Sequence, residues 1–145
     1  MASVDACLET WQASDQRPDP IELLEQQNTN RLPWLIAERH RRMAQSPFAW
    51  FRGSAAVMAR DLGSRPNSGL TVQLCGDAHL LNFGFYASPE RTLVFDINDF
   101  DETFPGPWEW DLKRLLVSLV LVARPLGLDR EEQSCLVRKV ASRYR

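Results

Sequence analysis

The residues of this sequence that are best suited to chemistry gather in two short stretches between residues 76 and 111. The first stretch follows a predicted strand and contains Asp77, His79 and Asn82. The second follows a predicted hairpin and has five polar residues: Asp96, Asn98, Asp99, Asp101 and Glu102. A rigid sheet presents reactive groups on the loops at its strand ends, and carboxylates on two adjacent loops can share a divalent cation. The two stretches therefore predict a metal-assisted site.

The spacing within these stretches indicates a more particular chemistry. Asn82 follows Asp77 by five positions, and Asp99 is followed directly by Phe100. In a kinase catalytic loop an aspartate reaches the attacking hydroxyl, and an asparagine five positions later turns back toward the metal. An Asp-Phe pair beyond the next hairpin supplies a second metal ligand. The pattern therefore favours phosphoryl transfer.

Each of these residues also has a structural interpretation. Asp77 could be a turn residue after a strand, Asn82 could form an Asx-turn, and the acids of residues 96–102 could belong to a solvated loop. Taken singly, each residue is more typical of structure than of function. Taken together at the kinase spacing, they favour a catalytic loop.

Other metal chemistries fit the sequence less well. An EF-hand over residues 96–107 would have Phe100 at its fifth position and Pro107 where a bidentate glutamate is needed. A dinuclear metallophosphatase needs more histidines than His40 and His79. Zinc is not indicated, because the chain has no cluster of cysteine and histidine.

The elements that must position these residues are mainly helical. Asp19 followed by Pro20 indicates the start of a first helix. Apolar residues at helical spacing predict one helix over residues 48–62 and a stronger one over residues 108–124. A capping-box pattern that begins at Asp129 predicts a last helix.

The strand signals are shorter. Alternating apolar residues predict a strand over residues 70–75. A hairpin is predicted from residues 83–87 and 92–97, because residues 88–91 have the composition of a turn. The acidic segment 98–107 is expected to be irregular. The sequence therefore predicts an α+β fold that is mainly helical, with a short strand and a hairpin carrying the site loops.

Composition and charge exclude several classes of function. The 145 residues include 17 Lys and Arg against 19 Asp and Glu, and the net charge of -2 gives no electrostatic reason to bind nucleic acid. The most apolar run, residues 115–123, is shorter than the ~20 residues that span a bilayer. Cys7, Cys75 and Cys135 are too few for a disulfide framework, which favours a reducing compartment. We therefore expect a cytoplasmic protein without nucleic-acid or membrane partners.

Three motifs resemble known proteins. The segment GDAHLLNFG resembles the GDxHxxN catalytic loop of the aminoglycoside phosphotransferase and choline kinase group of kinase-like enzymes. NDFDE is similar to the metal-binding stretch of that group, and PGPWEWDLKRL to its later stretch in which an aspartate opens a long helix. Together with RMAQSPFAWFRG, these motifs resemble more closely an uncharacterised bacterial family, the domain-of-unknown-function family twenty-two fifty-two, over about residues 41–124.

The resemblance implies catalytic and positioning roles for three residues. Asp77 would be the catalytic base, or would orient the acceptor hydroxyl. Asp111 would brace the catalytic loop from the start of the long helix. His79 would fix the loop by hydrogen bonding. The fold implied is a fragment of a kinase-like catalytic lobe.

The resemblance also implies a metal and a nucleotide. Asn82 and Asp99 would bind Mg²⁺, and ATP would be the phosphoryl donor. Asp99 suits the family pattern through its distance to Asp111, whereas Asp96 and Asp101 remain substitutes for it.

Kinase-like chemistry also needs a glycine-rich flap and a strand-borne lysine on the nucleotide phosphates. The glycines never form GxGxxG, and Lys113 and Lys139 lie in predicted helices. In the resembling family these parts follow the catalytic loop, so the nucleotide-binding lobe would lie beyond Arg145. We therefore expect residues 1–40 to be an N-terminal helical segment and residues 41–145 a partial kinase-like catalytic domain, truncated at its C-terminus.

Three functional hypotheses follow from these observations. The first is the N-terminal part of a kinase-like phosphotransferase of unknown acceptor, inactive without a C-terminal lobe of the same protein. The second is a non-enzymatic binding module on a degenerate kinase-like core, with Trp108 and Trp110 in its partner surface. The third is a truncated gene product without a function of its own. For the chain made alone, we expect exposed apolar surface and marginal solubility.

Overall fold

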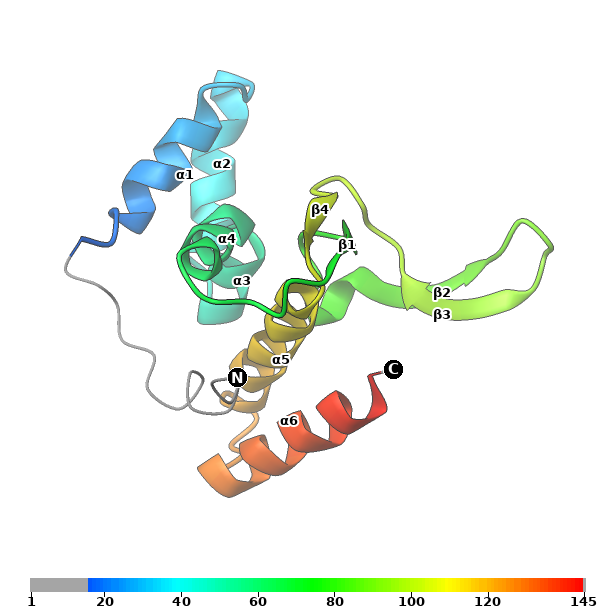
Figure 1. Cartoon of the computed structure of the whole chain (residues 1–145). Helices are drawn as coiled ribbons and strands as arrows, with labels where there is room; N and C mark the ends of the chain where they lie inside the picture. The colour runs from blue at the N-terminus through cyan, green and yellow to red at the C-terminus, as the bar shows by residue number, and fades with distance from the viewer. Residues whose placement is uncertain (1–15, 145) are drawn as a thin grey trace.

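The chain forms an α+β structure in which helices dominate and the strands occur in two antiparallel pairs (Figure 1). The computed structural model describes residues 16–144, so residues 1–15 of the predicted N-terminal segment, with Cys7, lie outside the described part. The helices are α1 (Pro20–Asn28), α2 (Pro33–Met43), α3 (Pro47–Arg52), α4 (Ala55–Gly63), α5 (Glu109–Ala123) and α6 (Arg130–Arg143), with a 3-10 turn at Leu80–Asn82. The strands are β1 (Thr71–Leu74), β2 (Phe83–Ala87), β3 (Leu93–Ile97) and β4 (Phe104–Pro107). The predicted α+β class is confirmed.

Two helix starts carry the capping signals that the sequence predicts. The Asp19 carboxylate accepts a backbone N–H two residues on at 2.8 Å, and Pro20 occupies the first position of α1. At the start of α6, Asp129 accepts the N–H of Glu132 at 2.9 Å, and the Glu132 carboxylate accepts the N–H of Asp129 at 2.9 Å. This reciprocal pair is a capping box. Both predicted starts are therefore confirmed.

The single helix predicted over residues 48–62 is wrong, because the structure divides it into α3 and α4. The break lies at Gly53 and Ser54. The Ser54 hydroxyl donates to a carbonyl one turn earlier at 2.8 Å, so it competes with the backbone for the last carbonyls of α3. Gly53 allows Met43 to pack closely, since a Cβ at residue 53 would lie 2.6 Å from the Met43 side chain. Tertiary packing thus interrupts a segment with helical periodicity.

The strands pair as predicted in one place and differently in another. β2 and β3 form the predicted hairpin, with Phe83 opposite Ile97. The expectation that residues 98–107 are irregular is wrong for Phe104–Pro107, which forms β4 and pairs with β1. This strand contains two prolines, which are not typical of strands, so the sequence pattern does not indicate it. In a two-stranded sheet each strand is an edge, and edge strands tolerate proline.

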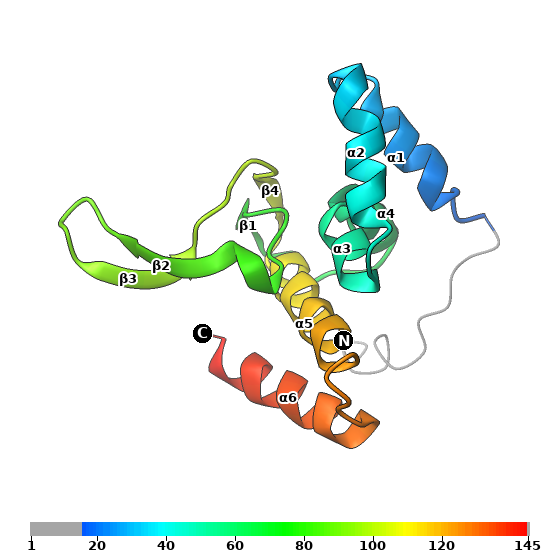
Figure 2. The ribbon, with the colours of Figure 1, turned by 180° about the vertical axis from the view of Figure 1, so that it is seen from behind.

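The β2–β3 hairpin extends away from the helices (Figure 1 and Figure 2). Because side chains alternate along a strand, Phe85, Leu93 and Phe95 fall on one face of it. They are 71%, 70% and 59% exposed, and the rings of Phe85 and Phe95 meet edge to face with centroids 5.0 Å apart. This face provides exposed apolar surface of the kind that we expect from the sequence.

Helix α5 lies at the centre of the packing. It packs against α3, α4 and α6, and its bounds confirm the helix predicted over residues 108–124. The apolar residues buried on β1, the following loop and α5 are Leu74, Cys75, Ala78, Leu115, Leu119 and Ala123. Leu24 of α1 forms a separate buried cluster with Met43 and Val57. The predicted division of the chain into an N-terminal segment of residues 1–40 and a domain of residues 41–145 stays a prediction. Within residues 16–144, no helix is long and apolar enough to cross a membrane.

Candidate functional site

Helix α5 carries a row of polar side chains on its buried face. Asp111, Arg114 and Ser118 are three and four residues apart, which places them on one side of the helix. They are 8%, 3% and 0% exposed. Buried polar groups destabilise a fold unless they are hydrogen-bonded. All three side chains contact the loop of residues 75–82, and we call them the α5 polar row.

The two ends of the α5 polar row hold backbone N–H groups of this loop. The Asp111 carboxylate accepts hydrogen bonds from Cys75 at 2.7 Å and from Gly76 at 3.1 Å. The Ser118 hydroxyl accepts from Leu80 at 3.0 Å. Burial raises the pKa of Asp111, while the two N–H donors act in the opposite direction by stabilising its carboxylate. The loop is therefore fixed to α5 on both sides of Asp77.

Arg114, at the middle of the row, pairs with Asp77. Its Nε donates to Asp77 Oδ1 at 2.5 Å, and its Nη2 donates to the carbonyl of Phe51 at 2.8 Å. The guanidinium also lies over the Phe51 ring, 4.2 Å from the centroid. One buried cation thus joins the candidate base on the loop to the end of α3.

Asn82 and the segment of Asp99 are held beside Asp77 by backbone contacts. The Asn82 side-chain amide donates to the carbonyl of Asp77 at 2.8 Å. The N–H of Asn98 donates to the carbonyl of Asn82 at 3.0 Å, and the thiol of Cys75 donates to the carbonyl of Asp99 at 3.2 Å. The structure therefore brings together the two loops that carry the predicted metal ligands.

The carboxylates of the second loop are exposed. Asp99 Oδ1 accepts the N–H of Asp101 at 3.2 Å, and Asp96 on β3, opposite Gly84, accepts the N–H of Ile97 at 2.8 Å. Within the described part of the chain, no three side chains of His, Cys, Asp or Glu are grouped closely enough to hold a metal ion. A metal at this site would therefore need further ligands from water or substrate.

His79 is a titratable group of the loop that is almost fully buried. It is 2% exposed, packs edge to face with Phe48, and its Nε2 accepts from Arg52 Nε at 3.3 Å. The same Nε2 lies 3.7 Å from Asp77 Oδ2, and Nδ1 has no hydrogen-bond partner among the described residues. Burial lowers the pKa of His79. The imidazole is therefore a neutral acceptor that connects Arg52 to the surroundings of Asp77.

Comparison with known families matches residues 31–145 to the family described as "Uncharacterized protein conserved in bacteria (DUF2252)". The match covers more than half of the chain. The chain belongs to this family. The comparisons with curated proteins and with solved structures each gave no match. Membership of DUF2252, predicted from the motifs, is confirmed, whereas the kinase-like resemblance stays a prediction.

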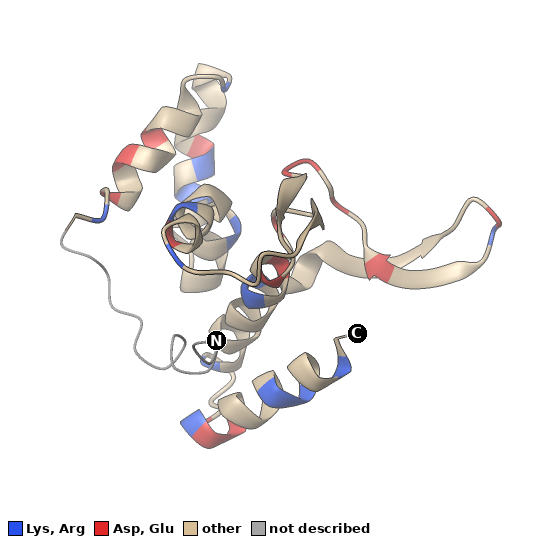
Figure 3. Ribbon diagram, in the orientation of Figure 1, with Lys and Arg blue, Asp and Glu red and all other residues tan. Residues whose placement is uncertain are grey.

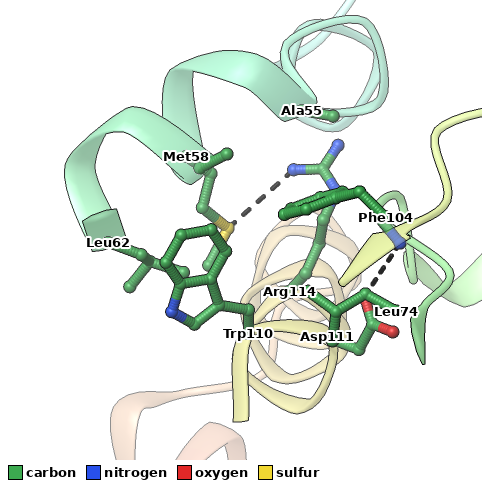
Figure 4. Close-up of a pocket in the computed structure, with 10 residues that line it drawn as sticks. Ala55, Met58, Leu62, Leu74, Phe104, Trp110, Asp111 and Arg114 are labelled. Atoms are coloured by element: carbon green, nitrogen blue, oxygen red, sulfur yellow. Dashed lines mark hydrogen bonds between the residues drawn. The ribbon is translucent and has the colours of Figure 1, made fainter. Parts of the chain in front are cut away.

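A narrow pocket in this DUF2252 chain borders the α5 polar row (Figure 4). Asp111 and Arg114 form its polar wall, and the Arg114 Nη1 lies 3.8 Å from the sulfur of Met58. Leu62 and Trp110 line the apolar side. These side chains pack α4 against α5. We therefore assign the pocket to packing rather than to ligand binding.

Charge is divided across the DUF2252 site. Acidic residues occupy the connection between β3 and β4, where Asp99 lies (Figure 3). On the side of α3 the nearest charge to His79 is the cation of Arg52, the last residue of that helix. Asp77 thus lies between an acidic and a basic side.

Sequence reasoning missed three residues of this site, namely Arg52, Arg114 and Ser118. The spacing of Arg114 and Ser118 from Asp111 was an available signal, because polar residues on one face of an apolar helix need buried partners. Arg52 gives no comparable signal, since its position depends on the break between α3 and α4.

Below about pH 6.5 we expect His79 to make the DUF2252 fold less stable. Its pKa is lowered by folding, so the unfolded chain binds its proton more readily. The contribution of neutral His79 to the free energy of unfolding is complete above the unfolded pKa of 6.5. It declines as pH falls toward the folded pKa, by at most about 1.4 kcal/mol per pH unit. Urea unfolding between about pH 5 and pH 7 measures this dependence.

The matched control for this prediction is the second histidine, His40, which is only partly buried. His79→Gln should flatten the pH dependence in this range, and His40→Gln should retain it. Equal slopes in wild type and His79→Gln would contradict the assignment.

Proposed function

We propose that this chain carries the catalytic loop of a kinase-like phosphotransferase that acts on an acceptor hydroxyl or similar group, of unknown identity. One observation carries the proposal. The α5 polar row fixes the loop of residues 75–82 so that Asp77 and Asn82 are hydrogen-bonded to each other, with the backbone of Asn98 and Asp99 bonded beside them. Such an arrangement supports a base and two metal ligands acting on one reaction centre.

The two oxygens of Asp77 have different surroundings. Oδ1 is paired with Arg114. Oδ2 has His79 Nε2 at 3.7 Å, beyond hydrogen-bonding distance, and that nitrogen already accepts from Arg52. The Asp77 side chain is 18% exposed, so Oδ2 is the atom we assign to accept the proton of the acceptor hydroxyl.

Asn82 and Asp99 fit the ligand chemistry of magnesium. The Asn82 amide nitrogen donates to the carbonyl of Asp77, which leaves the amide oxygen as a metal ligand, and the Asp99 carboxylate is exposed. Mg²⁺ commonly binds one or two carboxylates and completes its shell with waters and substrate phosphates. A bound Mg²⁺ with ATP would supply the phosphoryl group and neutralise its charge. Lys113 and Lys139 both lie on helices, so we assign neither of them to the nucleotide phosphates.

We expect Mn²⁺, used as a paramagnetic substitute for Mg²⁺, to broaden the backbone NMR signals of Asn82 and Asp99 selectively. Asp99→Asn removes a charged oxygen ligand, so it should weaken the apparent affinity by about tenfold or more. The titration of broadening against Mn²⁺ concentration gives that affinity.

Glu131→Gln on α6 is the matched control, because it removes an exposed carboxylate that lies outside the loop of Asp99. Asp96→Asn and Asp101→Asn identify which neighbouring acid contributes. Broadening that is unchanged by Asp99→Asn, or that is centred away from Asn82, would reject this metal site.

A second candidate, a non-enzymatic binding module, is favoured by one specific observation. Asp77 is already neutralised by buried Arg114, a contact in which the carboxylate stabilises the fold without any reaction. Calorimetry on the chain with Mg²⁺ separates the candidates. Metal binding that depends on Asp99 supports the phosphotransferase, and the absence of metal binding supports the module.

A further inference from the structure

Arg52 differs from the other exposed arginines in how it is anchored. Its Nε donates to the buried Nε2 of His79 at 3.3 Å, next to the candidate base Asp77. Neither Nη nitrogen of Arg52 is hydrogen-bonded to another described residue, and no described carboxylate lies within 4.0 Å of its guanidinium. The cation is thus held at the edge of the site by one nitrogen while its remaining donors are unused.

The neighbouring arginine does not share this property. Arg114 is 3% exposed, and its charge is matched by Asp77 while a second nitrogen serves the carbonyl of Phe51. His79 is neutral, because burial and the nearby guanidiniums lower its pKa. The positive charge of Arg52 is therefore the one in this cluster that has no anionic partner.

We propose that Arg52 binds an anionic group, a carboxylate or a phosphate, on the acceptor substrate and so places the acceptor hydroxyl beside Asp77. The guanidinium fork suits both anions, since each can take two parallel N–H donors. The acidic side of the site, with Asp99, is assigned to the metal and nucleotide. This inference rests on the proposed function for the identity of the acceptor, but the anion site itself can be tested without it.

Inorganic phosphate is the probe, titrated into the 145-residue chain without Mg²⁺ at constant ionic strength. The readout is the imidazole ¹⁵N signals, which are simple because the chain has two histidines, and His40→Gln assigns them. We expect a saturable shift of the His79 signals and none of the His40 signals. Arg52→Gln should weaken this binding by about tenfold or more, because it removes a charge-assisted bidentate contact.

Three further variants complete the experiment. Arg60→Gln, which removes an exposed arginine from α4, should leave the phosphate affinity unchanged. Arg52→Lys keeps the charge but not the planar fork, so it should give an intermediate phosphate affinity. This variant also tests the anion site if Arg52→Gln does not fold. Asp99→Asn should not weaken the phosphate affinity, since an acceptor anion needs neither the metal nor its ligands.

The outcomes separate the sources of the anion. A His79 shift that needs Mg²⁺ and Asp99 would assign Arg52 to the nucleotide phosphates and overturn the acceptor proposal. No His79 shift, or an equal shift in Arg52→Gln, would overturn the anion site. Failure of Mn²⁺ to bind at Asp99 would reject the proposed function while leaving a phosphate-dependent His79 shift intact.

Discussion

Replacing Arg114 with methionine should destabilise the fold by about 3 kcal/mol. The substitution leaves the carboxylate of Asp77, 18% exposed, without its partner, and removes the donor to the carbonyl of Phe51. Breaking a mostly buried ion pair from one side is far more destabilising than removing both charges, because an uncompensated charge remains. The free energy of unfolding from urea denaturation, followed by circular dichroism, measures the loss.

The double variant Asp77→Asn with Arg114→Met distinguishes charge from volume. It should be more stable than Arg114→Met alone, because no buried charge is left unpaired. Arg114→Lys should fall between wild type and Arg114→Met, since lysine keeps the charge but cannot serve both Asp77 and Phe51 with a planar fork. If the double variant were no more stable than Arg114→Met, the ion pair would not be the source of the effect.

Gly76→Ala should have the largest effect of any single methyl addition discussed for this chain, with more than about 4 kcal/mol lost. The residue has φ +86, which L side chains rarely adopt, and its Cβ would lie only 2.0 Å from the carbonyl oxygen of Glu102. That oxygen belongs to the backbone and cannot move aside without displacing the segment before β4. Because the Gly76 N–H also donates to Asp111, the clash would strain this contact with α5 as well.

Two other glycines provide matched controls. Gly69 and Gly127 have φ of +76 and +82, but a Cβ on either would meet nothing within 4 Å. Alanine at these positions should therefore be destabilising only by the backbone strain of about 1–2 kcal/mol. Thermal unfolding of the three variants side by side separates strain from the clash. A Gly76→Ala protein as stable as Gly69→Ala would mean that the loop does not approach Glu102 as closely as the structure has it.

Elements with a strong local pattern could be predicted from the sequence. The hairpin of β2 and β3, the long α5 and the capping box at Asp129 each depend on residues that are close together in the chain. The break between α3 and α4 and the strand β4 could not be predicted. Both depend on tertiary partners: the Met43 side chain of α2 packs on Gly53, and Phe104–Pro107 pairs with a strand 30 to 36 positions away.

In the candidate site, too, the local features could be predicted from the sequence and the long-range contacts could not. The spacing of Asp77, Asn82 and Asp99 is a local pattern, and it identifies the loops that the structure brings together. The partner of Asp77 is Arg114, 37 positions further along the chain, and no periodicity relates the two residues. The ion-pair partner of Asp77 therefore depends on tertiary structure and could not be predicted from the local sequence.

The α5 polar row also determines when the site can form during folding. The N–H groups of Cys75, Gly76 and Leu80 bond to side chains 36, 35 and 38 positions away. A contact at that separation requires closure of a long chain segment before any of these bonds can stabilise it. Until α5 docks, water solvates the loop donors and Asp77 has no partner. We therefore expect the site and the centre of the core to assemble in one cooperative step, with no ordered loop before α5 docks.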